Sequence, residues 1–324
     1  MDTFDRILLP TDFSTTARQA LSFAAHLAAR HDAVLHILHV RTPAEERKQP
    51  PGVDAPTTQE ELAECARRAG EELGAPTAPA VDVLSLVRDT VAADSVSDAV
   101  LDYACEYEMD LIVMGTARRS GLRTLFPQST ASAVVRHSPC PVLTVLDTPD
   151  NVPGPIDQIF VPYDFSEPAA KAVRYGKALA EGYGATVTLV HVVQDLTVPM
   201  EYELNVPDVK TADVQARAEA ALQEEAADRH RVLVATGHPG RRIVELAEER
   251  AADLLVLATH GRTGLRRILL GSVAEQVIRR ASCPVLTVNA FPSSDQKTSE
   301  PIDNPDRSDQ VSASASVSNT GSKS

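Results

Sequence analysis

The sequence predicts an α/β protein made of two tandem, doubly wound domains, each with a five-stranded parallel sheet and helices on both faces. Short apolar runs alternate along the chain with longer segments of helical period, which is the order that βαβ units give to a parallel sheet. Four short segments also return, in the same order, in the second half of the chain, so one unit is used twice. The repeated segments begin at residues 6 and 158, 35 and 187, 110 and 253, and 140 and 283.

The elements of the first copy follow from its apolar pattern. Strands are expected at residues 6–9, 34–40, 80–87, 111–114 and 142–146. Helices are expected at residues 15–31, 59–73, 96–107 and 129–136. Ser14 stands where it can cap the first helix, and the proline and charge of residues 42–58 favour a loop there. The second copy repeats this plan over residues 158–289.

Composition marks the boundaries between these parts. Residues 147–155 are rich in proline, aspartate and glycine and predict a linker. Residues 291–324 are rich in serine, aspartate and proline with almost no apolar side chains, so they are expected to be disordered, either as a solubilising tail or as a regulatory arm. The expected domains are therefore residues 1–147 and 156–290, followed by this tail.

Charge and composition exclude several classes of function. The 324 residues carry 45 acidic and 31 basic side chains and are 43% apolar, which suits two folded domains but not a general binder of nucleic acid or anionic membranes. The start lacks the features of a signal peptide, and no apolar run approaches the ~18 residues of a membrane span. A cytoplasmic protein is therefore expected. The four cysteines lack metal-ligand spacing, so they are interpreted as small buried residues and no metal site is predicted; they are Cys65, Cys105, Cys140 and Cys283.

A glycine-bearing loop in the second copy carries the strongest functional signal. It follows the apolar run 254–258, contains Gly261 and Gly264, and ends at Gly271 and Ser272, where a helical pattern starts. Glycines let backbone N–H groups approach phosphate oxygens, and a helix N-terminus adds partial positive charge. The loop is neither a Walker loop nor a dinucleotide fingerprint, because its glycine spacing differs and no Gly-Lys-Ser/Thr is present.

This loop resembles the nucleotide loop of the universal stress protein family. The family pattern is Gly, two residues, Gly, nine residues, Gly and then Ser or Thr, and here Ala258, Gly261, Gly271 and Ser272 stand at those positions. Ala258 is a departure, because the family has glycine there. The resemblance implies an adenine nucleotide alpha hydrolase-like fold and a stress-response protein that binds ATP, or ADP or AMP, with or without Mg²⁺.

Three strand ends of the second copy are expected to converge on this loop, because parallel α/β sheets bind ligands at the carboxyl ends of their strands. The resemblance implies that Asp164 accepts from the ribose hydroxyls, that the Val192 backbone contacts adenine and that the loop holds the phosphates. A carboxylate suits this role, since it accepts charge-assisted bonds from a diol. The expected nucleotide-binding residues are Pro162, Tyr163, Asp164, Val192, Ala258, His260, Gly261, Arg262, Gly264, Gly271, Ser272 and Val273.

Other roles are open to several of these residues. Asp164 could form an Asx turn that starts a helix, and Ser272 could cap its own helix as well as bind phosphate. Arg266 and Arg267 could pair with phosphate or be surface cations. His260, like other loop histidines, could simply face solvent.

The first copy departs from the loop pattern. Gly115 and Ser129 are kept, but Arg118 and Gln128 replace the second and third glycines, and their side chains would enter the space that phosphates need. One nucleotide per chain, held mainly by the second copy, is therefore expected. A second adenine-ribose site without a phosphate cradle could survive at Asp12, Val40, Gly115 and Ser129.

Three functions compete. The first is an ATP- or ADP-binding regulatory protein of the universal stress type. The second is an enzyme, but the motifs of a pyrophosphatase-type ligase and of a nucleotidyl transferase are missing; no catalytic residue is predicted, and slow ATP hydrolysis or self-phosphorylation on Ser272 stays open. The third is a nucleotide-free dimeric scaffold, because residues 142–145 and 285–288 are apolar edge strands that can pair within one chain as a pseudo-dimer. Whether chains also pair with each other is left open.

Overall fold

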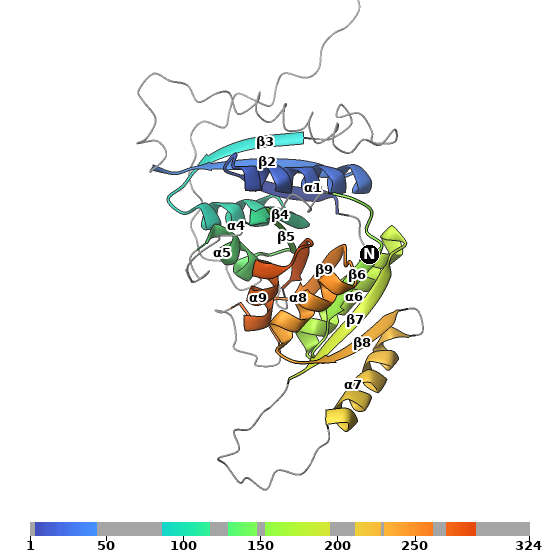
Figure 1. Ribbon diagram of the computed structural model, residues 1–324. Helices are drawn as coiled ribbons and strands as arrows, with labels where there is room; N and C mark the ends of the chain where they lie inside the picture. Colours follow the sequence, from blue (N-terminus) through green and yellow to red (C-terminus); the bar gives the residue numbers. More distant parts are fainter. Residues whose placement is uncertain are drawn as a thin grey trace, which may run out of the picture. The chain divides into compact units, whose positions relative to one another are not determined.

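The computed structural model describes residues 4–43, 86–116, 129–147, 153–194, 211–227, 230–261 and 270–289, all within one compact unit, Met1–Pro292. Figure 1 shows the first copy in blue to green and the second in yellow-green to red. The strands are β1 (Arg6–Thr11), β2 (Val34–Arg41), β3 (Leu86–Ala92), β4 (Leu111–Thr116), β5 (Val142–Leu146), β6 (Gln158–Pro162), β7 (Thr186–Val193), β8 (Arg231–Thr236), β9 (Leu254–Ala258) and β10 (Val285–Val288). The helices are α1 (Thr15–His31), α4 (Val96–Glu106), α5 (Thr130–His137), α6 (Glu167–Tyr183), α7 (Thr211–Ala226), α8 (Pro239–Glu249) and α9 (Ser272–Arg280).

The strands form a 10-stranded sheet in the order β3-β2-β1-β4-β5-β10-β9-β6-β7-β8. Every neighbouring pair within a copy is parallel. The order within the second copy mirrors that of the first, so β6, like β1, lies between the second and fourth strands of its copy. From β6 the chain adds β7 and β8 on one side and then β9 and β10 on the other, so the strand order reverses between β6 and β9. A doubly wound sheet binds its ligands at such a switch point. The predicted α/β class with tandem, mostly parallel domains is confirmed.

Alternate residues of each strand pack into two different cores. Ile7 and Leu9 of β1 face the cluster that α1, α6 and α7 cover, whereas Leu8 between them faces the cluster that α4, α5, α8 and α9 cover. This alternation is what a pleated strand buried on both faces requires. The sheet is therefore covered on both faces by helices. The helix expected at residues 59–73 lies outside the described residues.

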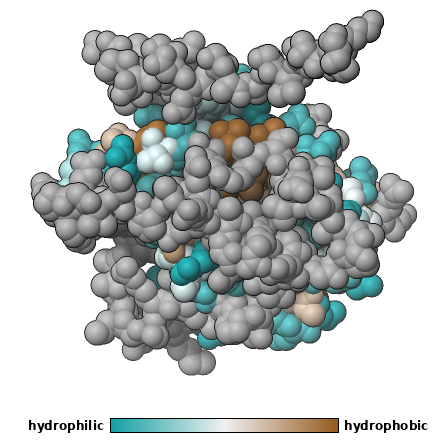
Figure 2. All heavy atoms as spheres, turned by 90° about the horizontal axis from the view of Figure 1, so that it is seen from above, coloured by the Kyte–Doolittle hydropathy of each residue, from teal (hydrophilic) through white to brown (hydrophobic). Residues whose placement is uncertain are grey.

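Residues 80–85 of the expected strand at 80–87 lie outside the described residues, and β3 runs over Leu86–Ala92, five residues beyond the expected end. The apolar residues that suggested the earlier range are followed by Arg88 and Asp89, which belong to β3 and pair with β2. An edge strand can carry such polar residues, since part of it faces water. Val87 of β3 is 38% exposed, and the view from this side in Figure 2 shows brown apolar atoms among teal and grey ones.

The two copies are joined by β5 and β10, which pair antiparallel with Leu143 opposite Leu286. The Thr144 hydroxyl donates to the Val285 carbonyl at 3.2 Å. The equivalent Thr287 hydroxyl donates to the Val142 carbonyl at 3.1 Å. Each copy thus gives the other the same hydrogen bond, as an isologous contact does.

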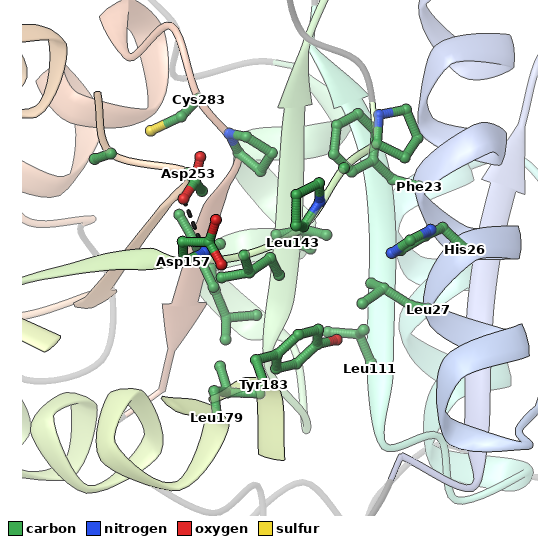
Figure 3. A pocket seen from close by; sticks show the side chains of 18 of the residues that line it. Phe23, His26, Leu27, Leu111, Leu143, Asp157, Leu179, Tyr183, Asp253 and Cys283 are labelled. Carbon is green, nitrogen blue, oxygen red and sulfur yellow. Dashed lines mark hydrogen bonds between the residues drawn. The ribbon is translucent and has the colours of Figure 1, made fainter. Parts of the chain in front are cut away.

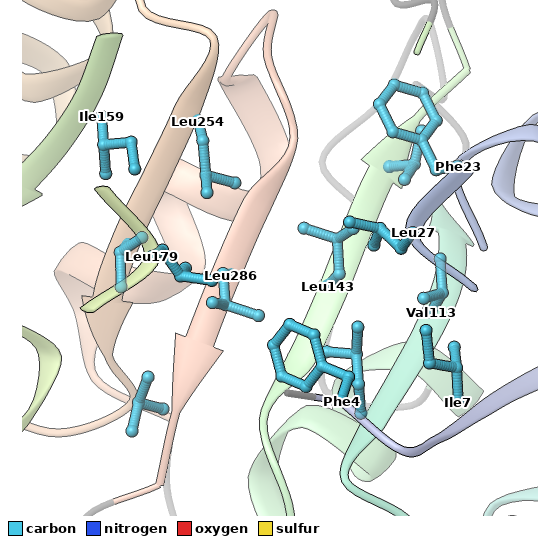
Figure 4. Close-up of a cluster of buried hydrophobic side chains, with 14 of the residues drawn as sticks. Phe4, Ile7, Phe23, Leu27, Val113, Leu143, Ile159, Leu179, Leu254 and Leu286 are labelled. Atoms are coloured by element: carbon cyan, nitrogen blue, oxygen red, sulfur yellow. The ribbon is translucent and has the colours of Figure 1, made fainter. Parts of the chain in front are cut away.

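Both copies contribute buried apolar side chains next to this joint. Figure 4 shows Leu143 and Leu286 on neighbouring strands, with Phe4, Leu27 and Leu179 around them. None of the described helices is long and apolar enough to cross a membrane. The expected disordered tail lies outside the described residues, as does most of the expected linker.

Candidate nucleotide site

The candidate site starts at the corner where β6 turns into α6. β6 ends at Pro162, and Tyr163 and Asp164 follow it. Asp164 Oδ1 accepts from the Ser166 backbone N–H at 3.0 Å and from the Ser166 hydroxyl. The Ser166 oxygen accepts in turn from the Ala169 N–H and caps α6. The Asx turn weighed from the sequence is therefore present, and one of the two carboxylate oxygens makes it.

The other carboxylate oxygen of Asp164 lies beside the glycine loop. A Cβ atom added at Gly261 would lie 2.6 Å from Asp164 Oδ2, closer than real side chains come. Gly261 does not have a left-handed φ, so glycine is needed here for space rather than for backbone conformation. The ends of β6 and β9, which pair in the sheet, therefore bring Asp164 and Gly261 together.

The far end of the loop is anchored to the end of β9. Gly271 donates its N–H to the Thr259 carbonyl at 2.8 Å, and a Cβ atom at Gly271 would lie 3.0 Å from that oxygen. Thr259 is fully buried, and its hydroxyl donates to Asn289 Oδ1 at 2.7 Å. Asn289 Nδ2 then donates to the Ser138 carbonyl of the first copy at 2.6 Å. Sequence reasoning missed Thr259 and Asn289, because neither belongs to the glycine pattern.

Ser272 and its counterpart Ser129 differ in what their hydroxyls do. In α5, Ser129 is the N-cap residue, and its oxygen accepts from the Ser132 N–H at 3.1 Å. In α9, Gly271 takes the N-cap position without a side-chain bond, and Ser272 is the first helical residue. Of the two roles open to Ser272 in the sequence, the structure therefore does not show the helix cap. Its exposed hydroxyl has no hydrogen-bond partner among the described residues, and it lies with the unpaired first-turn N–H groups of the helix.

The other expected site residues either lie outside the described residues or are half-buried next to the site. Residues 262–269 lie outside the described part of the chain, and with them Arg262, Gly264, Arg266 and Arg267. Their contacts with phosphate stay predictions. His260 is half-buried, with Nδ1 3.0 Å from the Thr259 hydroxyl, so it does not simply face solvent. Ala258 and Val273 are also half-buried, and both pack against the cores.

Aromatic rings line the corner between β6 and β7. The Phe165 ring lies 5.0 Å from Tyr163 and 4.8 Å from His191 between ring centroids, and Phe165 is 40% exposed. Phe165 has a φ of 65°, which is strained for a bulky residue. His191 Nδ1 lies 2.8 Å from the Tyr163 carbonyl, so this histidine joins β7 to β6 next to the half-buried Val192. The sequence did not single out Phe165 as a wall of the site.

The phenol and amine closest to this region are shifted toward their neutral forms. Burial raises the pKa of Tyr163, and the carboxylates of Glu225 and Asp164 raise it further. Burial also lowers the pKa of Lys171, helped by Arg174. The Lys171 amine donates to the Asn289 carbonyl at 2.7 Å. It therefore braces the residue that holds Thr259.

The first copy has the same turn between its first strand and α1, but the residues around that turn differ. Asp12 Oδ1 accepts from the Ser14 N–H at 3.0 Å, and Phe13 repeats the positive φ at 61°. A Cβ atom at Gly115 would lie 2.3 Å from the Thr16 carbonyl oxygen, so this glycine is needed where α1 packs on the end of β4. Val40 is buried. Arg118 and Gln128 lie outside the described residues.

Cysteines and metal ligands do not add to the site. Burial raises the pKa of Cys140 and of Cys283 to about 12, as expected of small buried residues. Cys105 is exposed, which the sequence interpretation did not foresee, and Cys65 lies outside the described residues. In the part of the chain that the structure covers, no group of three or more His, Cys, Asp or Glu side chains is placed to hold a metal ion.

Comparison with known proteins identifies the family. The model of the "Universal stress protein family" matches residues 3–145 and again residues 155–289, once for each copy. The chain belongs to the universal stress protein family.

Relatives agree with this assignment. Universal stress protein MJ0531 of Methanocaldococcus jannaschii is 36% identical over 137 residues, which cover 40% of this chain and 81% of the relative. Universal stress protein Mb2028c of Mycobacterium bovis is 30% identical over 189 residues, covering 55% of this chain and 61% of the relative.

A solved structure shows the same fold over nearly the whole chain. The crystal structure of a universal stress protein from Archaeoglobus fulgidus matches with a TM-score of 0.59 and 22% identity, covering 88% of this chain and 98% of that one. At this identity the likeness carries the fold alone. The ligand of this universal stress protein must therefore be argued from its own residues.

Proposed function

We propose that this universal stress protein binds ATP or ADP at the carboxyl ends of β6, β7 and β9 and acts in the cytoplasm as a nucleotide-controlled regulatory protein of the stress response. The observation that supports the proposal most is the meeting of Asp164 Oδ2 with Gly261. A carboxylate beside a glycine loop at the switch point of a doubly wound sheet is suited to a ribose with phosphates attached.

Each part of the nucleotide has a group suited to it. Asp164 Oδ2 would accept from a ribose hydroxyl while Oδ1 stays in the turn with Ser166. The Val192 backbone would contact the adenine edge, and the exposed ring of Phe165 offers an apolar face to the base. The Ser272 hydroxyl and the first N–H groups of α9 would donate to phosphate oxygens. Any Mg²⁺ would be held mainly through the phosphates, as is common for this ion.

We propose binding rather than catalysis as the function. The chain's groups orient the nucleotide, and none is assigned as a base or nucleophile. Slow ATP hydrolysis or phosphate transfer to Ser272 would be a side reaction. Radiolabelled γ-phosphate, followed on the protein and in solution, measures both.

The domains and the pseudo-dimer belong to the same proposal. We propose residues 1–147 and 156–290 as the two universal stress protein domains, with the second as the main nucleotide holder. The reciprocal bonds of Thr144 and Thr287 support a stable pairing of the copies through β5 and β10 in solution. The same pairing supports the second candidate function, a nucleotide-free scaffold.

Native mass spectrometry of the purified chain separates the two candidates. A mass increase equal to one adenine nucleotide, lost in Asp164→Ala, supports the nucleotide function. If neither the purified protein nor the protein mixed with millimolar ATP shows this increase, the scaffold function takes its place.

A further inference from the structure

A cavity of about 410 Å³ lies where the two copies join, on the sheet face that α1 and α6 cover. Leu111, Leu254 and Pro284 line it, and they stand at or just before the starts of β4, β9 and β10. The cavity is therefore at the amino ends of these strands, whereas the nucleotide site is at the carboxyl ends. Its volume is in the ~300–1,000 Å³ range of small-molecule sites.

Most of the walls of the cavity are apolar side chains, and they come from both copies. Leu27 of α1 and Leu179 of α6 occupy equivalent places in the repeat, and so do Leu143 of β5 and Leu286 of β10. Figure 3 shows Leu27 and Leu179 approaching the same space from α1 and α6. Aromatic side chains, Phe4 and Phe23, complete the apolar lining. Such a lining suits a hydrocarbon chain.

Residues of the expected linker form part of the cavity wall. Pro153, Gly154 and Pro155 belong to the lining. A Cβ atom at Gly154 would meet no atom of the described chain within 4 Å, so there is open space beside the linker.

The lining has no lysine or arginine among the described residues, and its two carboxylates disfavour an anion. The Asp253 carboxylate accepts from the Asp157 and Gln158 N–H groups at 2.9 and 2.8 Å, whereas Asp157 lines the cavity as a second acid. Arg30 stacks on the Tyr183 ring at 4.3 Å but is not a lining residue. The charge of the lining thus favours a ligand without negative charge.

One polar group is placed to hold the head of such a ligand. His26 points from α1 into the cavity (Figure 3), and its ring has no hydrogen-bond partner among the residues described. Burial lowers the pKa of His26, with a further contribution from Arg30. The ring is therefore neutral at neutral pH and offers one donor and one acceptor.

We propose that this cavity is a binding site for an uncharged, single-chain amphiphile. Its hydrocarbon tail lies among the leucine and phenylalanine side chains of both copies, and its hydroxyl or carbonyl head is hydrogen-bonded to His26. The site is separate from the nucleotide site and does not depend on it.

Calorimetric titration of the full chain with 1-decanol tests the proposal, with decanoate as the charged probe. Saturable binding of one 1-decanol per chain is expected, with decanoate at least tenfold weaker. Leu27→Phe and Leu179→Phe fill the space and should weaken 1-decanol at least tenfold. Leu101→Phe makes the same change on α4 outside the lining and should leave binding unchanged. ATP binding should be the same in all three variants.

The role of His26 has its own readout. His26→Leu should weaken 1-decanol several-fold and leave the melting temperature near that of the parent, because the ring bonds to no described residue. The proposal is overturned if the parent does not bind 1-decanol saturably, if decanoate binds as tightly, or if both filling variants fold and still bind with parental affinity. Unfolding of the filling variants leaves the parent and His26→Leu titrations to decide.

Discussion

At the scale of single residues, the two carboxylate oxygens of Asp164 have different surroundings. Oδ1 holds the turn into α6, and Oδ2 lies beside Gly261. Asp164→Ala should weaken ATP and adenosine alike, because both contain the ribose. A lost charge-assisted bond costs about 1.5–3 kcal/mol, so affinity should fall at least about tenfold in calorimetry. Asp12→Ala removes the same turn from the first copy and should leave ATP affinity unchanged; equal losses in both variants would show a general effect on folding.

Gly261 is required by the same carboxylate. Gly261→Ala places a methyl group where Asp164 Oδ2 now lies, 2.6 Å away, so the carboxylate must rotate. The change should therefore weaken adenosine as well as ATP, by a factor similar to that of Asp164→Ala. Parallel titrations with both ligands measure this. A loss confined to ATP would mean that Gly261 contacts phosphate and does not act through Asp164.

A change at Gly271, unlike one at Gly261, should weaken ATP without weakening adenosine. Its φ of −57° suits any residue, but a side chain would crowd the buried Thr259 carbonyl 3.0 Å away and stand at the start of α9. Gly271→Gln should lower ATP affinity at least about tenfold, by the loss of a charged hydrogen bond, and leave adenosine nearly unchanged. Unaltered ATP affinity in a folded Gly271→Gln protein would remove α9 from the phosphate site.

The residue pattern singled out Gly261, Gly271 and Asp164 but not what a side chain at each glycine would meet. A Cβ atom would meet the Asp164 carboxylate, which is distant in sequence, at Gly261 and the hydrogen-bonded Thr259 carbonyl at Gly271. No local pattern encodes such contacts. Thr259 and Asn289 were missed for the same reason, since their bond joins the residue after β9 to the residue after β10.

At the scale of elements, the equivalent helices α5 and α9 begin differently. Ser129 caps α5, whereas Ser272 follows a glycine cap. Ser129→Ala should therefore cost about 1 kcal/mol of unfolding free energy, as lost caps do, without changing ATP affinity. Ser272→Ala should weaken ATP with little effect on stability. Urea unfolding and calorimetry on both variants measure the contrast, and a stability loss in Ser272→Ala comparable to that in Ser129→Ala would contradict it.

The joint between β5 and β10 makes a symmetric prediction. Thr144→Val and Thr287→Val each remove one of two equivalent hydrogen bonds while keeping the side-chain shape. Each should lower the free energy of unfolding by a similar amount, about 1 kcal/mol. Urea denaturation measures both. A cost in only one of them would show that the copies do not pair in solution as isologous partners.

Element existence was easier to predict than element limits. The buried strands β1, β4 and β9 stand out as short apolar runs, because both of their faces are covered. The end of β3 was placed too early, at residue 87, because the edge of a sheet accepts residues such as Arg88 and Asp89. The start of α9 depends on whether Gly271 or Ser272 is the N-cap residue, and the sequence allows either.

At the scale of the whole molecule, the two copies share a fold but differ at the residues equivalent to the proposed nucleotide site. The first copy keeps the Asp12 corner, yet Ser129 is used as a cap and Gly115 is packed against the Thr16 carbonyl. The second copy leaves the Ser272 hydroxyl exposed at the start of α9. The strand pairing that joins the copies is thus symmetric, whereas the serines at the starts of α5 and α9 are used differently.

This asymmetry leads to a stoichiometry that can be counted. Calorimetric titration of the full chain should reach one ATP per chain, because a glycine loop, a serine hydroxyl that makes no cap bond and the Asp164 carboxylate occur together in the second copy. In the first copy Arg118 and Gln128 stand where those glycines would be. Gly271→Gln should reduce the measured heat to a weak residual signal rather than to half of it, since no equal site remains. Two ATP per chain, or half of the heat surviving with parental affinity, would place a working site in the first copy as well.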